Sequence, residues 1–299
     1  MNMRMNPIWT LAVGMFAILM PPAKAGAILP AGFTAGIEYY NGTSTVPILY
    51  QLTPFVLASS ASQASISGCL IATASQSACG TGRAAMGNLG ARSSLTDLNP
   101  STIPGGSEDA NASSIFWDVL TVTGPSMAGG QTYTMVPTVT IHGTGSWNNV
   151  ALPQTVGLGI EEFGPDGTSV LETLYPDATQ SSYSMTFTLD GIPFQPGVQF
   201  NFALGFGEAA RIYTGPAAAE NTQVSANFLS TMLLTGITVS DSQGGAVPNF
   251  TIQSDSGTVY GKNGVVPEPA SAAMLALGVL AIGVFRVRRS AARRLRVNP

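Results

Sequence analysis

Residues 182–206 read SYSMTFTLDGIPFQPGVQFNFALGF, and this stretch decides the fold class. Over 182–190, and again over 198–206, apolar side chains occupy every second position and small or polar ones lie between them. Successive side chains of a β-strand point to opposite faces of the sheet, so this alternation is typical of a half-buried strand. The segment from Asp190 to Pro193 has the composition of a turn. The stretch therefore predicts two strands connected by a turn.

The same pattern recurs through the middle of the chain. Residues 131–142 place Tyr133, Met135, Val139 and Ile141 on one face of a predicted strand. Further strands are predicted at 115–123, 156–160, 170–174, 223–229, 232–239 and 250–253, with a Gly-Pro-Asp-Gly turn at 164–167. Short strands separated by Gly and Pro turns, without helical periodicity, predict an all-β ectodomain at 26–260, built as a β-sandwich or jelly roll.

Residues 58–92 depart from this pattern, because Ala, Ser and Gly dominate and aromatic residues are missing. We expect a long loop or a short helix over the sandwich there. The segment contains Cys69 and Cys79, each beside a glycine, and in an oxidising compartment we expect them to form a disulfide. Residues 99–111 are predicted to be a surface loop, and residues 261–266 a flexible stem.

The 299 residues contain few charges, and their placement is uneven. Six of the twelve basic residues lie within 286–296, and Arg4 and Lys24 lie near the N-terminus. Between Gly26 and Phe285, four basic residues face all sixteen acids, a net charge of −12. This balance argues against nucleic-acid binding, which needs a clustered basic surface. One His and two Cys also argue against a zinc site, and we expect no metal or cofactor.

The N-terminus has the three parts of a secretory signal peptide. A basic start at Arg4 precedes thirteen almost wholly apolar residues at 8–20, and Ala23-Lys24-Ala25 follows as a small-x-small cleavage site. We predict a signal peptide at 1–25 with cleavage after Ala25. The rest of the chain is then exported through the inner membrane.

The C-terminus combines a proline motif, an apolar run and a basic tail. Pro267, Glu268 and Pro269 precede sixteen uncharged residues at 270–285, which as a helix would span about 24 Å. We predict a transmembrane helix at 271–285, although the hydrocarbon core is about 30 Å thick and some adjustment is needed. Six arginines then form the stop-transfer signal: Arg286, Arg288, Arg289, Arg293, Arg294 and Arg296. They hold the tail inside.

This C-terminal arrangement at 267–296 resembles the PEP-CTERM sorting signal. The resemblance implies that exosortase, a membrane-embedded cysteine transpeptidase, recognises and cuts the tail. It also implies a Gram-negative bacterium that makes exopolysaccharide, and a membrane-anchored precursor whose product reaches the cell surface or the medium. The alternative is that Pro-Glu-Pro is only a stiff linker before an anchor helix. The resemblance does not identify the role of the ectodomain.

Candidate catalytic residues are few. His142 is the only histidine, and its position on the polar face of a predicted strand favours an exposed residue at the end of that strand over a catalytic one. Glu161 and Glu162 are adjacent, so on a strand they face opposite ways and cannot act together on one bond. Asp166 lies in Pro-Asp-Gly, which is sufficient as a turn signal. Motifs for nucleophilic, zinc or nucleotide chemistry are missing, and we expect no enzyme activity.

Binding sites have slightly more support. Trp147, between Gly-Ser and Asn-Asn, is the best candidate for a sugar contact, although such a residue often packs inward; Trp117, within a strand, is expected in the core. Asp241 and the Glu108-Asp109 pair are loosely suited to calcium, but they form no ordered repeat of ligands.

Three functions remain. We favour an exosortase-sorted structural protein of the bacterial surface, associated with exopolysaccharide or a biofilm matrix. The alternative is a carbohydrate-binding or adhesive module. A secreted hydrolase ranks last, because recognisable catalytic residues are missing.

Overall fold

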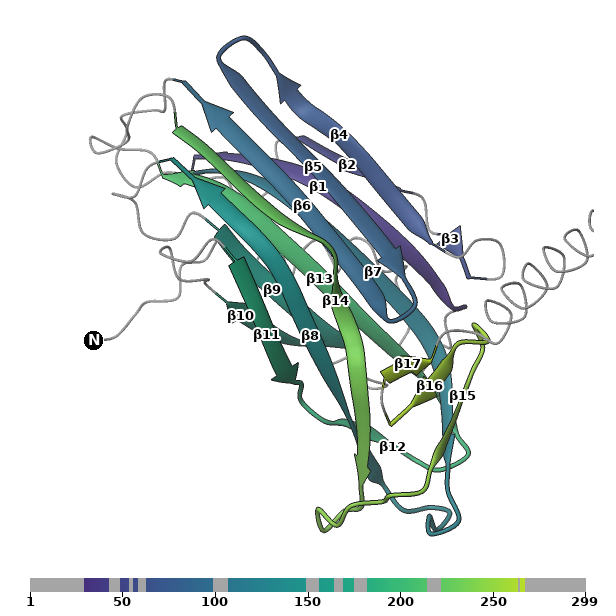
Figure 1. Ribbon diagram of the computed structural model, residues 1–299. Helices are drawn as coiled ribbons and strands as arrows, with labels where there is room; N and C mark the ends of the chain where they lie inside the picture. The colour runs from purple at the N-terminus through teal and green to yellow at the C-terminus, as the bar shows by residue number, and fades with distance from the viewer. Residues whose placement is uncertain are drawn as a thin grey trace, which may run out of the picture. The chain divides into compact units, whose positions relative to one another are not determined.

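The computed structural model describes residues 30–42, 49–53, 56–58, 63–98, 107–148, 156–163, 169–174, 182–213, 222–262 and 264–266. Within these ranges the regular structure consists of seventeen β-strands and no helix (Figure 1). The described residues up to Val265 belong to one compact unit. The all-β prediction is therefore confirmed for the described residues.

Eight strands form sheet A, in the order β10-β9-β13-β7-β1-β2, with β15 paired to β7 and β3 paired to β1. All of these pairings are antiparallel. The bounds are β1 Gly32–Gly42, β2 Leu49–Leu52, β3 Val56–Leu57, β7 Ser107–Thr123, β9 Val156–Phe163, β10 Ser169–Leu174, β13 Gln199–Tyr213 and β15 Thr251–Ser254.

Seven strands form sheet B, in the order β11-β8-β14-β6-β5-β4, with β12 paired to β8. These pairings are also antiparallel. The bounds are β4 Ala64–Ala72, β5 Gln76–Ala85, β6 Asn88–Asp97, β8 Tyr133–Trp147, β11 Ser182–Thr188, β12 Ile192–Phe194 and β14 Thr222–Ser240. A separate pair joins β16 Val259–Gly261 to β17 Gly264–Val266.

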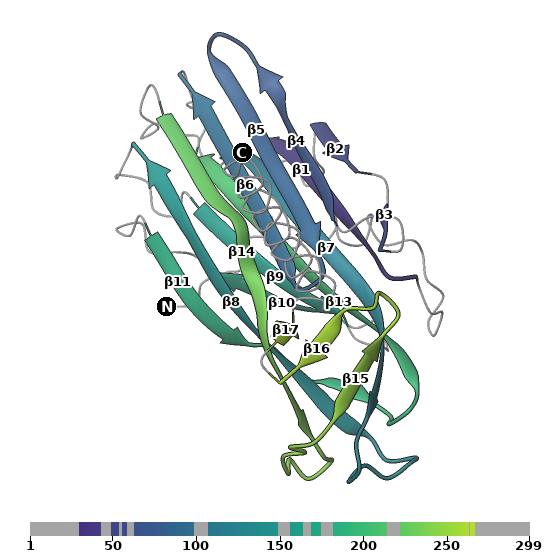
Figure 2. The same ribbon diagram turned by 45° about the vertical axis from the view of Figure 1, so that its right-hand side comes forward.

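The two sheets pack face to face around a single hydrophobic core, in a sandwich-like arrangement (Figures 1 and 2). Sheet A contributes Phe202 and Phe206, and sheet B contributes Met135 and Phe228, all buried. The rings of Phe206 and Phe228 meet across the interface edge to face, with centroids 6.3 Å apart. Aromatic pairs of this geometry add to the stability that burial provides.

Strand β5 packs tightly against sheet A through small side chains. Its inward positions are Ala78, Gly80, Gly82 and Ala84, all buried. A Cβ added at Gly80 would lie 2.6 Å from Cγ2 of Ile37 on β1, so only glycine fits at this distance. The small side chains of β5 are thus what allows the opposite sheet to approach.

This region corrects a prediction from the sequence. Residues 58–92 are neither a long loop nor a helix, because β4, β5 and the first half of β6 run through them. Ala and Gly at the inward positions replace the large apolar residues that usually reveal a strand. The disulfide between Cys69 and Cys79 is confirmed, and it links directly paired residues of β4 and β5.

Two further boundaries differ from the predictions. The predicted surface loop at 99–111 ends earlier, because β7 begins at Ser107. The predicted stem at 261–266 includes β17, which pairs with β16. The regions expected at 223–229 and 232–239 are one strand, β14, whose register with β6 and β8 shifts between Asn227 and Met232.

The predicted turn at 190–193 is wrong in part, because β12 begins at Ile192 and pairs with β8, and the strands on either side of it, β11 and β13, belong to different sheets. The remaining strand predictions are confirmed, and several strands are longer than expected. Strand β8 continues to Trp147 and β13 continues to Tyr213. The signal peptide at 1–25, the Pro-Glu-Pro motif, the helix at 271–285 and the arginine tail lie outside the described residues. Among the described residues, no helix is long and apolar enough to cross a membrane.

Candidate functional site

Charge is divided between the two sheets. The strands of sheet A carry eight acidic residues and one basic residue, Arg211. The strands of sheet B carry Arg83, Arg92 and His142 but a single acid, Asp97, which is buried. The candidate site depends on this division, because the exposed side of sheet B has cationic groups without carboxylates.

Two pairs of charged or polar groups are buried on β1, β7 and β13. Arg211 forms a two-point ion pair with Asp109, whose nearest atoms are 2.5 Å apart. Tyr40 donates a hydrogen bond of 2.6 Å to Glu38. Burial raises the pKa of Glu38 to about 7, and the hydrogen bond from Tyr40 opposes this rise. In both pairs, the two side chains bond to each other inside the folded protein.

Two more acids lie between the sheets. Glu208 on β13 accepts a hydrogen bond of 3.0 Å from Ser93 on β6, and its Oε1 has no hydrogen-bond partner among the described residues. Burial raises the pKa of Glu208 well above its ordinary value. Glu108 accepts a hydrogen bond of 2.7 Å from Gln76, and burial and then the charge of Asp97 raise its pKa. Burial therefore favours the neutral form of both acids more than water would.

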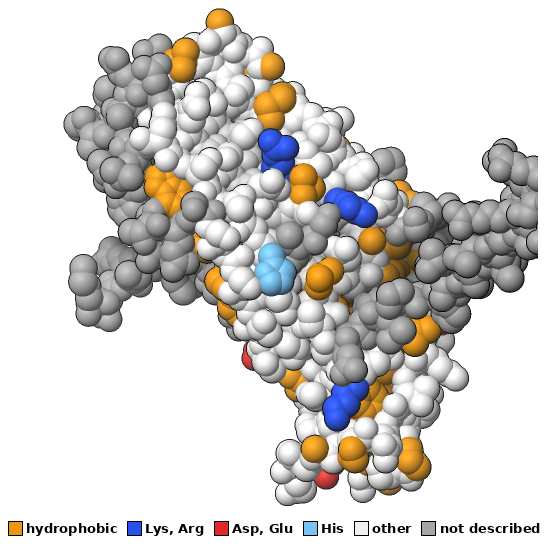
Figure 3. Space-filling view, in the orientation of Figure 1, with side chains coloured by type: hydrophobic (Ala, Val, Ile, Leu, Met, Phe, Trp, Pro, Cys, Tyr) orange, Lys and Arg blue, Asp and Glu red, His pale blue; other side chains and the backbone are white. Residues whose placement is uncertain are grey.

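The outward residues of sheet B form an exposed surface, which we call the hydroxyl face. Its polar members are Ser65, Ser67, Thr81, Arg83, Arg92, Ser94, Thr140, His142, Thr144, Ser146, Ser182, Ser184, Thr186, Ser225, Asn227 and Thr235. A few partly buried apolar side chains, such as Val136 and Leu233, lie among them. Figure 3 looks onto this side of the molecule, where blue basic groups and His142 lie on a largely uncharged surface. The face combines many hydroxyl groups with a few cations.

Strand register aligns these side chains in rows across the sheet. One row runs from Ser67 through Thr81, Arg92 and Asn227 to Thr144, each residue directly paired with the next. A neighbouring row contains the disulfide and then Ser94, Ser225 and Ser146. Paired strands lie about 4.8 Å apart, so each row presents polar groups at nearly regular intervals.

Several hydroxyl groups within the face bond to one another. The Oγ atoms of Ser146 and Ser225 are 2.8 Å apart, and those of Ser67 and Thr81 (Oγ1) are 2.9 Å apart. Thr140 bonds in the same way to Thr186, at 3.1 Å. Each hydroxyl can both donate and accept. These contacts position the side chains while leaving further hydrogen-bonding capacity toward solvent.

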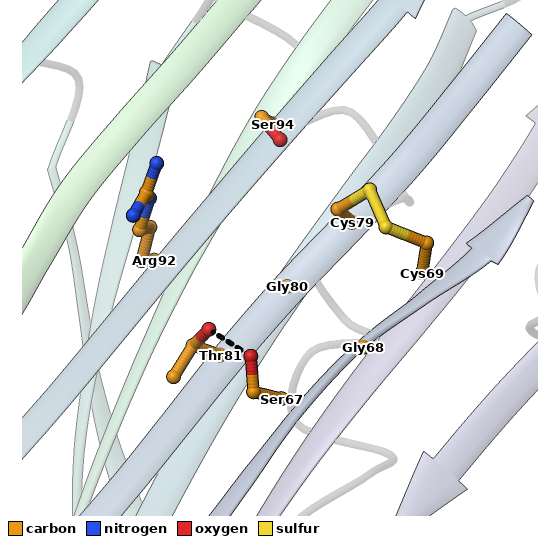
Figure 4. A pocket seen from close by; sticks show the side chains of 8 residues that line it. All are labelled: Ser67, Gly68, Cys69, Cys79, Gly80, Thr81, Arg92 and Ser94. Carbon is orange, nitrogen blue, oxygen red and sulfur yellow. Dashed lines mark hydrogen bonds between the residues drawn. A yellow bond between two sulfur atoms is a disulfide. The ribbon is translucent and has the colours of Figure 1, made fainter. Parts of the chain in front are cut away.

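An open depression of about 200 Å³ lies within the hydroxyl face (Figure 4). Arg92, Ser67, Thr81 and Ser94 line it together with the Cys69–Cys79 disulfide. Arg92 is exposed, and within the described part of the chain it makes no ion pair. A guanidinium group in this setting is available to an anionic ligand.

The residues singled out in the sequence do not converge on one site. His142 is exposed on the polar side of β8, as expected, although it lies in the middle of the strand. Trp147, at the end of β8, is partly buried against the core. Trp117 is buried, as predicted. Asp241 caps a turn by accepting hydrogen bonds from the backbone of Gln243 and Gly245.

The acids considered as catalytic or metal-binding groups are also separated. Glu161 and Glu162 occupy consecutive positions of β9. Glu108 and Asp109 lie within β7 and are buried, so they do not form part of a surface loop. Over the described ranges, no three His, Cys, Asp or Glu residues are grouped so as to hold a metal ion. Asp166 and the sorting-motif residues Pro267, Glu268 and Pro269 lie outside these ranges.

Sequence reasoning missed Arg92. The alternation of Leu89, Ala91 and Leu95 with polar residues on β6 already places Arg92 on the outward side. The neighbours of Arg92 on adjacent strands depend on the register, which a single sequence does not reveal.

Comparisons with known proteins assign no family. No protein-family model matches the chain, and no curated protein matches it. Weak similarities link it to two structures of infectious bursal disease virus, one of the Gx strain and one of the VP2 subviral particle. They are 11% and 12% identical, cover 70% and 86% of this chain, and have TM-scores of 0.16 and 0.13. The chain spans 61% of the length of the first and 74% of the second.

Proposed function

We propose that this chain is an exported, exosortase-sorted structural protein of a bacterial cell surface, associated with an exopolysaccharide or biofilm matrix. The observation that carries the proposal is the order of signals in the sequence. A signal peptide comes first, and a Pro-Glu-Pro motif, an apolar segment and an arginine tail come last. Exosortase would be the processing partner, and the membrane would hold the precursor through its C-terminal segment.

The fold of the described residues is compatible with such a role. An antiparallel sandwich with a disulfide suits an oxidising compartment. The outward surface of sheet B is rich in hydroxyl groups, which can exchange hydrogen bonds with a hydrated polysaccharide. We assign no catalytic residue, because the buried acids serve packing and internal hydrogen bonds.

The sorting proposal is tested by changing the Pro-Glu-Pro motif in a bacterium that has an exosortase. Because proline restricts its own backbone and that of the preceding residue, we expect the motif to favour an extended conformation that a processing enzyme can reach. We expect Glu268→Ala to leave the full-length precursor in the membrane fraction, while the unchanged protein loses its tail. Mass spectrometry of both termini measures the outcome.

Ser271→Ala is the matched control, since it lies in the same tail outside the motif and should be processed normally. If the Glu268→Ala protein loses its tail as fast as the unchanged protein, the sorting proposal is wrong.

A second candidate function is a carbohydrate-binding or adhesive module. The observation that favours it is the depression around Arg92 within the hydroxyl face. Trp147 gives this function less support, because its side chain packs against the core. Binding of the protein to a panel of immobilised polysaccharides would measure the activity, and no binding to any of them would remove it.

A further inference from the structure

We propose that the hydroxyl face binds a polysaccharide that carries carboxylate groups, with Arg92 as its central charged contact. This inference rests on the proposed function, since it names the class of matrix polymer that the protein would contact. It commits to one surface of the described structure and to one class of ligand.

The exposed side of sheet B is complementary in charge to a sparsely anionic polymer. Arg92 and Arg83 project from adjacent strands on the exposed side of sheet B. The single acid in the strands of this sheet, Asp97, is buried against the opposite sheet. Arg83 donates a hydrogen bond of 3.1 Å to Gln63. Arg92 makes no ion pair among the described residues, and the one acid on which its charge acts there is Glu208, which is buried beneath the sheet and whose raised pKa the charge of Arg92 opposes. A ligand with widely spaced negative charges would place them opposite these arginines and match the charge of the surface.

The hydroxyl rows surround Arg92 with groups that suit a sugar polymer. Arg92 has Thr81 and Asn227 as direct neighbours in its row, and Ser67 and Thr144 follow outward on either side. Their side chains are uncharged groups that donate and accept hydrogen bonds. A polymer that is itself rich in hydroxyl groups can bond to such rows over several units. A bare anion would use only the arginines.

The hydroxyl face does not have the features of a nucleic-acid-binding surface. Among the described outward positions of sheet B there is no aromatic side chain. Aromatic platforms are what single-stranded nucleic acids use for base stacking, and two arginines supply little of the charge that a phosphate backbone needs. Recognition on this surface therefore depends on hydrogen bonds and a few charge pairs, which fits a carboxylated polysaccharide.

The depression supplies a defined position for one carboxylate. Arg92 lines it together with Ser67, Thr81 and Ser94. A carboxylate placed there could accept two hydrogen bonds from the guanidinium group and further ones from the hydroxyls. The neighbouring disulfide fixes β4 to β5 on the other side of the depression. The site is thus held by three adjacent strands.

The test uses the full-length protein in a mild detergent and immobilised linear polygalacturonate. The same polymer with its carboxylates methyl-esterified is the uncharged comparison, and polyglutamate is a polyanion without sugar hydroxyls. We expect binding to polygalacturonate at least about tenfold tighter than to either comparison polymer. We also expect the affinity to fall as salt is added.

Two variants locate the site. Arg92→Gln should weaken binding to polygalacturonate about tenfold, and Arg83→Gln combined with it should weaken binding further. Lys262→Gln removes the same charge from an exposed residue outside the strands of sheet B, and it should leave binding within about twofold of the unchanged protein. Circular dichroism and Tm of each variant check that the fold is retained.

The inference is overturned if Arg92→Gln binds as tightly as the unchanged protein. It is also overturned if the esterified polymer or polyglutamate binds equally well. Removal of the tail is measured separately and does not depend on Arg92. A protein that is sorted normally but does not discriminate between the polymers would leave the sorting proposal standing. Tail removal despite Glu268→Ala would overturn sorting alone.

Discussion

At the scale of single residues, Asp118 shows how this fold uses a buried acid. Its carboxylate lies on the inner side of β7 and accepts hydrogen bonds from Ser256 at 2.6 Å and Tyr260 at 2.9 Å. The backbone of Val119 and Ser256 also donates to it. Burial raises the pKa of Asp118, and these hydrogen bonds oppose the rise. The network joins β7 to the turn after β15 and to β16.

Tyr260→Phe tests this network. The variant keeps the aromatic ring against Phe202 and loses only the hydroxyl that bonds to Asp118. We expect the free energy of unfolding to fall by about 1–2 kcal/mol, because a buried acceptor loses one of its donors. Chemical denaturation measures the change. Tyr50→Phe, on an exposed tyrosine, should change the stability by less than about 0.5 kcal/mol, and equal effects would contradict the assignment.

At the scale of secondary-structure elements, β5 determines how closely the sheets can pack. A Cβ added at Gly82 would overlap the carbonyl oxygen of Ser113 and would lie 3.0 Å from the Cβ of Ala35. Two strands of sheet A therefore press on this one position. The backbone of β7 cannot move away without separating its own hydrogen-bonded neighbours, β1 and β13.

Gly82→Ala should consequently destabilise the protein by about 1–3 kcal/mol, as overpacking of a tight core does. Gly207→Ala on β13 is the matched control, since its added Cβ would meet its nearest neighbours at 3.7 and 3.9 Å. That variant should stay within about 1 kcal/mol of the unchanged protein. Thermal unfolding of both proteins gives the comparison, and a Gly82→Ala variant as stable as the control would contradict the close packing.

The strands differ in how far the sequence predicts them. Strand β11 was predictable because large apolar residues such as Tyr183 alternate with serine and threonine. Strand β5 was missed because Gly80 and Gly82 occupy its inward positions, so the alternation is between small and polar residues. No strand was predicted for β1 either, although Phe33 and Ile37 lie four residues apart and therefore on the same face of a strand. Only the opposite sheet explains why glycine is needed in β5.

The candidate site was less predictable than the fold. The outward direction of Arg92 follows from the alternation along β6, but its neighbours Thr81 and Asn227 come from strands 11 residues earlier and 135 residues later in the chain. Register between such distant segments depends on the whole sheet. The sequence emphasised Trp147 because it is flanked by polar residues, whereas its position at the end of β8 turns it toward the core.

At the scale of the whole molecule, the buried acids predict an unusual response to pH. The pKa of Glu38 is about 7 in the folded protein against about 4.5 when unfolded, so the folded state holds an extra proton between these values. This contribution to stability is complete below about pH 4.5 and is lost as the pH rises through 7. Burial shifts the pKa of Glu208 and of Asp118 in the same direction.

We therefore expect the Tm to be higher at pH 5 than at pH 8. Glu38 alone contributes a difference on the order of 2–3 kcal/mol. Glu38→Gln keeps an acceptor for the Tyr40 hydroxyl and removes the titration, so it should flatten the pH dependence. Ser184→Ala, at an exposed residue without a titratable group, should leave the dependence unchanged. A Tm that rises from pH 5 to pH 8 would contradict this account.

The disulfide has a consequence for how copies of this protein can associate. Strand β4 stands at the end of the strand order of sheet B, where one side of a backbone is usually open to a strand of another molecule. Exchange of β4 between two copies would require it to leave β5, and the Cys69–Cys79 bond forbids that separation while it is oxidised. The oxidised protein therefore cannot exchange β4 between two copies, and the disulfide must be reduced before such domain swapping can occur.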